Sequence, residues 1–103
     1  MRRGKLTPEG QLTQSVKALL RTAGIFHFKH WGGPMGYPGV ADILGCYKGR
    51  MLAIELKSPT GKATPDQERF LQNVKDAGGL AFVARSLDDV IEGLGLQDRF
   101  LIR

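Results

Sequence analysis

Three polar side chains interrupt two apolar runs of the sequence, and their types suit metal-assisted hydrolysis. Asp42 opens the first run, and Glu55 lies near the end of the second, two residues before Lys57. Two carboxylates at close range raise each other's pKa, and a divalent cation between them removes the repulsion. Mg²⁺ and Mn²⁺ prefer such oxygen ligands and also bind phosphate oxygens. We interpret the three residues as parts of a phosphodiesterase in which Lys57 orients or deprotonates a water or stabilises charge on phosphorus.

A structural role is the alternative for the same residues. Asp42 would cap the start of a strand, and Glu55 with Lys57 would form a surface ion pair worth about 0–1 kcal/mol. Against this, both residues interrupt the apolar strand LAIELK, residues 52–57, whose composition indicates a sheet covered on both faces. The chemistry favours the catalytic interpretation.

The pairing of the two runs decides whether the carboxylates can meet. The runs, residues 42–47 and 51–57, are separated by Lys48-Gly49-Arg50, which predicts a hairpin. If Lys48-Gly49 is a two-residue turn, the two carboxylates lie directly opposite each other, whereas a three-residue loop breaks that pairing. Because side chains alternate along a strand, Lys57 lies on the same face as Glu55. The neighbouring apolar residues point the other way, into a core: Ile43, Leu52, Ile54 and Leu56.

Capping residues and apolar spacing predict the remaining elements. A hydroxyl residue followed by proline opens a helix at Thr7-Pro8 and again at Thr64-Pro65, where a capping box ends in Gln67. The strand, helix and strand from residue 51 to 84 predict a right-handed crossover between parallel strands. In chain order we expect a helix over 8–23, strands over 25–29, 42–47 and 51–57, a helix from Pro65 to Gly78-Gly79, a strand over 80–84, and a short helix from the Ser86 cap to Leu94. The tail, residues 95–103, is an edge strand or a contact with another subunit.

The stretch WGGPMGYPG, residues 31–39, holds four glycines and two prolines and is a loop with special backbone angles. Trp31 in this loop either anchors it by packing or stacks on a base or wedges a junction. Five basic residues are candidate phosphate contacts, each of which could equally be an ordinary solvated charge: Lys29, Lys48, Arg50, Lys62 and Lys75.

Length and composition predict one domain over residues 1–103. Fifteen Lys and Arg against ten Asp and Glu give a net charge of +5, which favours polyanionic partners. No apolar run approaches the roughly 20 residues needed to span a bilayer, so we expect no membrane contact and no export. Cys46 is the sole cysteine, which agrees with the cytoplasm, and we expect it to be a small core residue.

The order and spacing of the motifs resemble the VRR-NUC (virus-type replication-repair nuclease) branch of the PD-(D/E)XK nuclease superfamily. The resemblance rests on Gly39-Val40-Ala41-Asp42, the hairpin, Ile54-Glu55-Leu56-Lys57, Thr64-x-x-Gln67, and Ala77-Gly78-Gly79 before an apolar strand. It covers nearly the whole chain, and the short length resembles the stand-alone phage or bacterial members. It implies an α/β fold of the restriction-endonuclease-like type, a small mixed β-sheet flanked by helices.

The resemblance also implies roles for individual residues. Asp42 and Glu55 are implied as ligands of Mg²⁺ or Mn²⁺, with the backbone carbonyl of Leu56 in the same shell. Lys57 is implied as the catalytic lysine, and Gln67 as a helix glutamine near the site. Members of this branch usually carry a glutamate on the first helix, where this chain has Glu9-Gly10-Gln11. Either Glu9 takes that role from an earlier turn, or Gln11 replaces the acid.

These observations together predict a metal-dependent endodeoxyribonuclease. We expect it to be specific for branched DNA such as Holliday junctions, to form a homodimer that suits a two-fold junction, and to act in the cytoplasm of a bacterial or phage-infected cell. The alternatives are a flap-directed, nick-directed or restriction-like nuclease, and a catalytically inactive DNA-binding module on the same scaffold.

Overall fold

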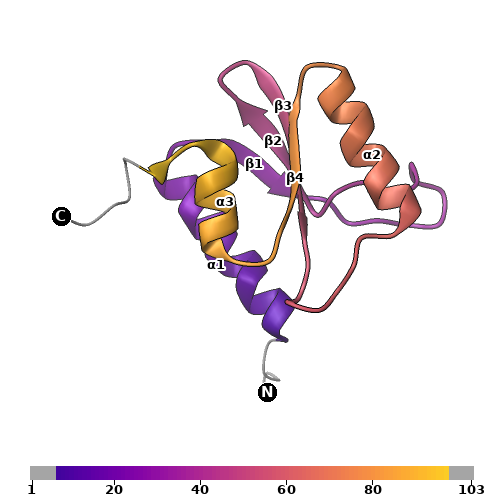
Figure 1. Ribbon diagram of the computed structural model, residues 1–103, viewed down its shortest axis with the longest axis horizontal. Helices are drawn as coiled ribbons and strands as arrows, with labels where there is room; N and C mark the ends of the chain where they lie inside the picture. Colours follow the sequence, from indigo (N-terminus) through magenta and orange to yellow (C-terminus); the bar gives the residue numbers. More distant parts are fainter. Residues whose placement is uncertain (1–6, 98–103) are drawn as a thin grey trace.

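A computed structural model describes residues 7–97, in which three helices flank a four-stranded sheet (Figure 1). In chain order the elements are α1 (Pro8–Thr22), β1 (Phe26–Lys29), β2 (Ile43–Tyr47), β3 (Arg50–Leu56), α2 (Pro65–Asp76), β4 (Leu80–Ala84) and α3 (Leu87–Leu94). The strand order is β1-β2-β3-β4; β1 and β3 run antiparallel to β2, and β4 runs parallel to β3. The predicted α/β fold with a mixed sheet is confirmed.

The turn between β2 and β3 fixes the register of the hairpin. Both residues of Lys48-Gly49 have positive φ, 54° and 78°, which is the combination that a two-residue type I′ turn needs. The register that follows pairs Ile43 with Ile54, so the next position outward sets Asp42 opposite Glu55. The predicted two-residue turn is confirmed, and the three-residue loop is excluded.

Two hydrophobic cores lie on the two faces of the sheet. On the first face α1 and α3 pack against buried strand residues that include Ile54 and Leu56. On the second face α2 packs where the small Ala53 and Ala81 leave room for it. Neighbouring residues of a strand point to opposite faces, so Glu55 lies on the second face, beneath α2.

The helix starts are those that the capping residues predicted. The hydroxyl groups of Thr7, Thr64 and Ser86 each accept a hydrogen bond from an amide in the first turn of the following helix. The strands begin and end within one residue of their predicted bounds. Most of the tail that was expected to be an edge strand or a subunit contact lies beyond residue 97, outside the described residues.

The prediction that Cys46 is a core residue is wrong, because its side chain is exposed. It lies on the second face of the sheet, in register with Phe26 on one side and Met51 on the other. These two neighbours are 71% and 46% exposed. α2 covers only the part of this face near Ala53, so the outer part stays open to solvent.

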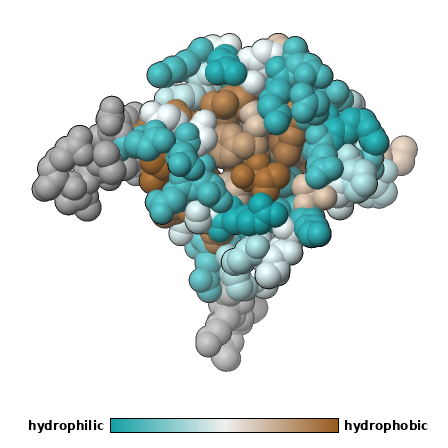
Figure 2. All heavy atoms as spheres, in the orientation of Figure 1, coloured by the Kyte–Doolittle hydropathy of each residue, from teal (hydrophilic) through white to brown (hydrophobic). Residues whose placement is uncertain are grey.

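One edge of the sheet is formed by β4, and its surroundings are apolar. Figure 2 shows hydrophobic side chains gathered over this strand, between α3 and α2, with hydrophilic side chains around them. None of the helices in the described part of the chain has the length and apolar character needed to cross a lipid bilayer.

Candidate active site

Asp42 lies directly before β2, and its carboxylate is held against β3. The backbone amide of Leu56 donates a hydrogen bond to Oδ2 of Asp42 over 2.9 Å. The hairpin register places Glu55 opposite Asp42 on the face that α2 covers. The Asp42 side chain is 30% exposed and the Glu55 side chain 2% exposed. The two predicted carboxylates are therefore neighbours, one at the mouth of the site and one beneath it.

Glu55 is a buried carboxylate with one unsatisfied oxygen. Its Oε1 is buried and has no hydrogen-bond partner among the described residues. The pKa of Glu55 is raised from 4.5 to about 7, chiefly by burial and then by the charge of Asp42, whereas the ammonium group of Lys57 lowers it. A hard divalent cation fits this arrangement, because it would satisfy the oxygen and cancel the repulsion between the carboxylates.

Each carboxylate has a lysine beside it. Nζ of Lys57 lies 3.4 Å from Oε2 of Glu55, and Nζ of Lys29, at the end of β1, lies 3.5 Å from Oδ1 of Asp42. The side chains of Lys57 and Lys29 are 16% and 20% exposed, so both are mostly buried. The four side chains form a compact cluster of two carboxylates and two ammonium groups, in which electrostatic interactions are stronger than at a solvated surface.

Gln67 connects the start of α2 to this cluster. Its Nε2 donates a hydrogen bond to Oε2 of Glu55 over 3.0 Å. Its Oε1 accepts from the amide of Thr64 over 2.8 Å, and its own amide donates to the Thr64 hydroxyl, which completes the predicted capping box. The capping role and the position beside the carboxylates therefore belong to the same side chain.

The loop between β1 and β2 is anchored at two points. At its neck the His30 amide donates to the carbonyl of Asp42 over 2.8 Å. On its far side the ring of Tyr37 packs edge-on against Phe70 of α2, with ring centroids 6.0 Å apart. The loop is thereby held between the end of the sheet and the helix that carries Gln67.

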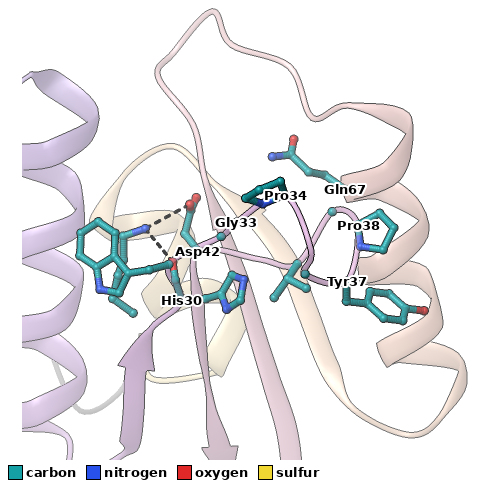
Figure 3. Close-up of a pocket in the computed structure, with 13 residues that line it drawn as sticks. His30, Gly33, Pro34, Tyr37, Pro38, Asp42 and Gln67 are labelled. Atoms are coloured by element: carbon teal, nitrogen blue, oxygen red, sulfur yellow. Dashed lines mark hydrogen bonds and ion pairs between the residues drawn. The ribbon is translucent and has the colours of Figure 1, made fainter.

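A cavity of about 490 Å³ opens between this loop and the carboxylate at the mouth of the site. In the view of Figure 3, Gly33 and Pro34 lie between Asp42 and Gln67, and Tyr37 lies against α2. The residues that line the cavity include Lys29, Trp31, Gly33, Tyr37, Asp42 and Gln67. All of the lining residues except Pro34, Pro38 and Val40 are polar, glycine or aromatic, so the cavity differs from an apolar packing defect.

The structure places two of the predicted basic residues, Lys29 and Lys62, near the site, and the other three far from it. Lys29 is part of the cluster, and Lys62 is exposed on the loop that follows Lys57. Lys48 and Arg50 lie at the hairpin turn, about 16 Å along the strand from the carboxylates at ~3.3 Å per residue. Lys75 is exposed in the last turn of α2, the opposite end from Gln67, and Arg50 donates to the carbonyls of Gly78 and Gly79.

Glu9 and Gln11 lie in the first turns of α1, and both are exposed. Figure 1 places this end of α1 at the same end of the molecule as the loop that follows β3. Within residues 7–97, no group of three or more Asp, Glu, His or Cys side chains is arranged to hold a metal ion. Among the described Asp, Glu, His and Cys residues, the site therefore brings together Asp42 and Glu55 without a third such side chain.

Two relationships at the site were not predicted from the sequence. Lys29 was expected only to contact phosphate, and its ion pair with Asp42 depends on the register of β1 against β2. The guanidinium of Arg85 donates to the carbonyl of Gly61 over 2.6 Å and so holds the loop that follows Lys57. No local sequence pattern predicts either contact, because each contact joins two segments that an irregular loop or a helix separates along the chain.

Comparison with known proteins identifies the domain to which these residues belong. The model of the VRR-NUC domain matches residues 36–88, just over half of the chain, and this range contains Asp42, Glu55, Lys57 and Gln67. Comparisons with curated proteins and with solved structures gave no match. The matched domain implies a nuclease-type function, and such domains generally use divalent metal ions. The family predicted from the motifs is confirmed: this chain belongs to the VRR-NUC domain family.

Proposed function

We propose that this protein is a Mg²⁺- or Mn²⁺-dependent endonuclease that hydrolyses phosphodiester bonds of DNA. The observation that carries the proposal is the buried carboxylate of Glu55, with one unsatisfied oxygen, opposite the carboxylate of Asp42. Two carboxylates in a shielded site repel each other, and a divalent cation between them would remove the repulsion and satisfy the free oxygen. The family supports a nuclease, and the net charge of +5 supports a polyanionic substrate.

Asp42 and Glu55 are the proposed metal ligands, together with the backbone carbonyl of Leu56. The Leu56 amide donates to Asp42, and an extended residue directs its N–H and C=O towards the same neighbouring strand, so this carbonyl is directed towards the Asp42 side. Such a ligand set suits Mg²⁺, which keeps several waters. Gln11, rather than Glu9, is proposed to complete the set from α1, since no third carboxylate of residues 7–97 joins the cluster. A cation bound here supplies Lewis acidity towards water and the phosphoryl oxygens.

Lys57 and Gln67 are proposed to prepare the site for the reaction. Nζ of Lys57, 3.4 Å from Glu55, can orient the attacking water or hold charge that develops on the phosphoryl oxygens. Gln67 occupies one oxygen of Glu55 by its hydrogen bond and leaves the other directed at a ligand. The division of the two oxygens sets the orientation of the carboxylate before any ligand arrives.

Branched DNA such as a four-way junction is the proposed substrate, cut in the cytoplasm by a homodimer in which residues 1–103 form a single domain of each subunit. The apolar surface over the edge strand β4 supports an interface with a second copy (Figure 2). A two-fold dimer presents two sites to a two-fold junction. Basic residues outside the cluster, namely Lys48, Arg50, Lys62 and Lys75, are proposed to contact phosphates along the arms.

The test is cleavage of labelled four-way junction, flap, nicked and linear duplex DNA with Mg²⁺, Mn²⁺ or EDTA. The wild type is compared with Glu55→Gln and Lys57→Met, and the matched controls are Glu92→Gln and Lys17→Met, which change the same side-chain types on α3 and α1. We expect metal-dependent cutting of the junction that either site variant abolishes while DNA binding persists. Cutting confined to flaps, nicks or linear DNA would reassign the substrate. Tight binding without cutting in any metal would leave a DNA-binding module and overturn the proposal.

A further inference from the structure

Trp31 is a large aromatic residue that the fold leaves in solvent. Its side chain is 81% exposed, and it belongs to neither hydrophobic core. The alternative that it anchors the loop by packing is therefore excluded; the edge-on contact of Tyr37 with Phe70 does that instead. An exposed indole at the rim of a cavity beside a candidate catalytic site indicates a contact with a ligand.

Lys29 joins this ring to the carboxylate at the mouth of the site. Its Nζ lies 4.8 Å from the ring centroid of Trp31, 3.5 Å from Oδ1 of Asp42 and 3.3 Å from the carbonyl of His30, to which it donates. The ammonium group covers one face of the indole. Because the side chain is 81% exposed, the opposite face is open to a flat partner.

Neither packing nor backbone conformation requires glycine at the two positions that follow Trp31, Gly32 and Gly33. A Cβ added at Gly32 or at Gly33 would meet no atom within 4 Å, and neither residue has positive φ. Packing and backbone angle would therefore tolerate a side chain at both positions. Both residues line the cavity, and without side chains they leave their backbone accessible from it.

We propose that this cavity is a subsite for an unpaired nucleobase next to the phosphate that is cut. The base stacks on the open face of Trp31, and Lys29 faces the adjoining phosphate. This inference rests on the proposed endonuclease function and names the substrate feature that the site recognises. Bases inside a duplex are already stacked and paired, so the subsite selects a nucleotide that is free at a branch point or gap. Stacking tolerates every base, so the selection is for structure and not for sequence.

Because Trp31 is the sole tryptophan of the chain, its fluorescence reports directly on stacking. The titrant is a branched duplex with unpaired thymidines at the branch, and the reference is a fully paired linear duplex of matched length, with Ca²⁺ replacing Mg²⁺ to slow cleavage. We expect the branched DNA to quench the tryptophan emission and the linear duplex to leave it nearly unchanged.

Affinities measured by anisotropy of labelled DNA test the same point with variants. Trp31→Ala should weaken binding of the branched DNA about ten- to a hundredfold and change binding of the linear duplex less than about twofold. Trp31→Phe should restore most of the affinity. Phe26→Ala is the matched control, since Phe26 is 71% exposed at the other end of β1, and it should leave both affinities unchanged.

The outcomes separate this inference from the proposed function. If wild type shows no quenching, or if Trp31→Ala weakens both DNAs equally, the subsite is wrong even where cleavage by the wild type is intact. If quenching and the selective loss are found but no metal supports cutting, the subsite stands and the proposed hydrolysis fails.

Discussion

Nε2 of Gln67 donates a hydrogen bond to Oε2 of Glu55 over 3.0 Å, while the rest of the Gln67 amide closes the capping box with Thr64. Two variants separate these roles. Thr64→Val removes the hydroxyl acceptor but keeps the Thr64 amide that holds Gln67, so we expect a loss of about 1 kcal/mol in unfolding free energy and unchanged cleavage. Gln67→Ala should lose similar stability and, in addition, at least about tenfold in kcat. Urea unfolding measures the stability of each variant, and a cleavage assay measures its kcat. Equal kcat in the two variants would show that Gln67 is only a cap.

The pH dependence of stability of the metal-free protein should come largely from Glu55. Its folded pKa of about 7 exceeds the ordinary 4.5, so the folded state binds the proton more tightly than the unfolded state. This contribution is fully present below pH 4.5, declines as the pH rises from 4.5 to 7, and is lost above that, in total about 3–4 kcal/mol at ~1.4 kcal/mol per pKa unit.

Glu55→Gln removes the titrating group and keeps its shape, so the variant should lack this decline and exceed the wild type in stability at pH 8. Urea unfolding in EDTA from pH 4 to 9 measures the curves. Glu92→Gln, which removes an exposed carboxylate on α3, should keep the wild-type curve. Parallel curves for wild type and Glu55→Gln would contradict the prediction.

Adding Mg²⁺ or Mn²⁺ at pH 8 should restore the stability that ionisation of Glu55 removes. A ligand that binds only the folded state stabilises it by about 2.7 kcal/mol at a hundredfold excess over its Kd. We expect a rise in melting temperature for the wild type and for Lys57→Met, and little or none for Asp42→Asn. Because the proton on Glu55 competes with the cation, the rise should shrink as the pH falls below 7. An equal rise for Asp42→Asn would place the metal elsewhere.

Lys29→Met should weaken DNA binding through the loss of one phosphate contact, whereas Lys57→Met should mainly reduce cleavage. The slope of log K against log salt concentration is about −0.9 for each phosphate neutralised, so Lys29→Met should reduce its magnitude by about 1. Lys17→Met on α1 is the control with an unchanged slope. If Lys29→Met leaves the slope as it is, Lys29 serves only to balance the charge of Asp42.

Gly39→Ala should detach the loop from α2 and destabilise the fold. Gly39 has a φ of +74°, and a Cβ there would overlap the carbonyl of Asp66 in the first turn of α2. We expect a loss of about 1–2 kcal/mol from the left-handed backbone and about 1–3 kcal/mol more from overpacking. Gly32→Ala, which meets open space, should stay within about 0.5 kcal/mol of the wild type in urea unfolding. Equal stabilities of the two variants would mean that the loop adjusts freely.

The sequence was sufficient to predict the pairing at the heart of the site because that pairing is local. Lys48-Gly49 predicted a hairpin with either a two-residue turn or a three-residue loop, and for the two-residue turn strand alternation carries the register to Asp42 and Glu55 without further information. Local signals also predicted the start of α2 at Thr64-Pro65 and the capping role of Gln67, whereas the position of Gln67 near the carboxylates was expected from the family resemblance.

Contacts across long or irregular segments could not be predicted in the same way. The position of Lys29 beside Asp42 depends on the pairing of β1 with β2, and a loop rich in glycine and proline between them sets no register. The exposure of Cys46 depends on how far α2 extends over the sheet, which the capping signals of the helix do not state. Arg50, a candidate phosphate contact in the sequence, is directed to the carbonyls of Gly78 and Gly79 by a crossover that brings distant segments together.

The two connections of β2 differ in how much change in length they can absorb. Inserting or deleting one residue at Lys48-Gly49 would turn every later side chain of β3 to the opposite face and exchange Glu55 with its apolar neighbours. The loop from His30 to Ala41 is fixed at its neck and against α2, so its exposed tip can lengthen, shorten or change composition while the carboxylates keep their places. Redesign of the substrate range should therefore graft new sequences onto this tip and leave the hairpin turn at its present length.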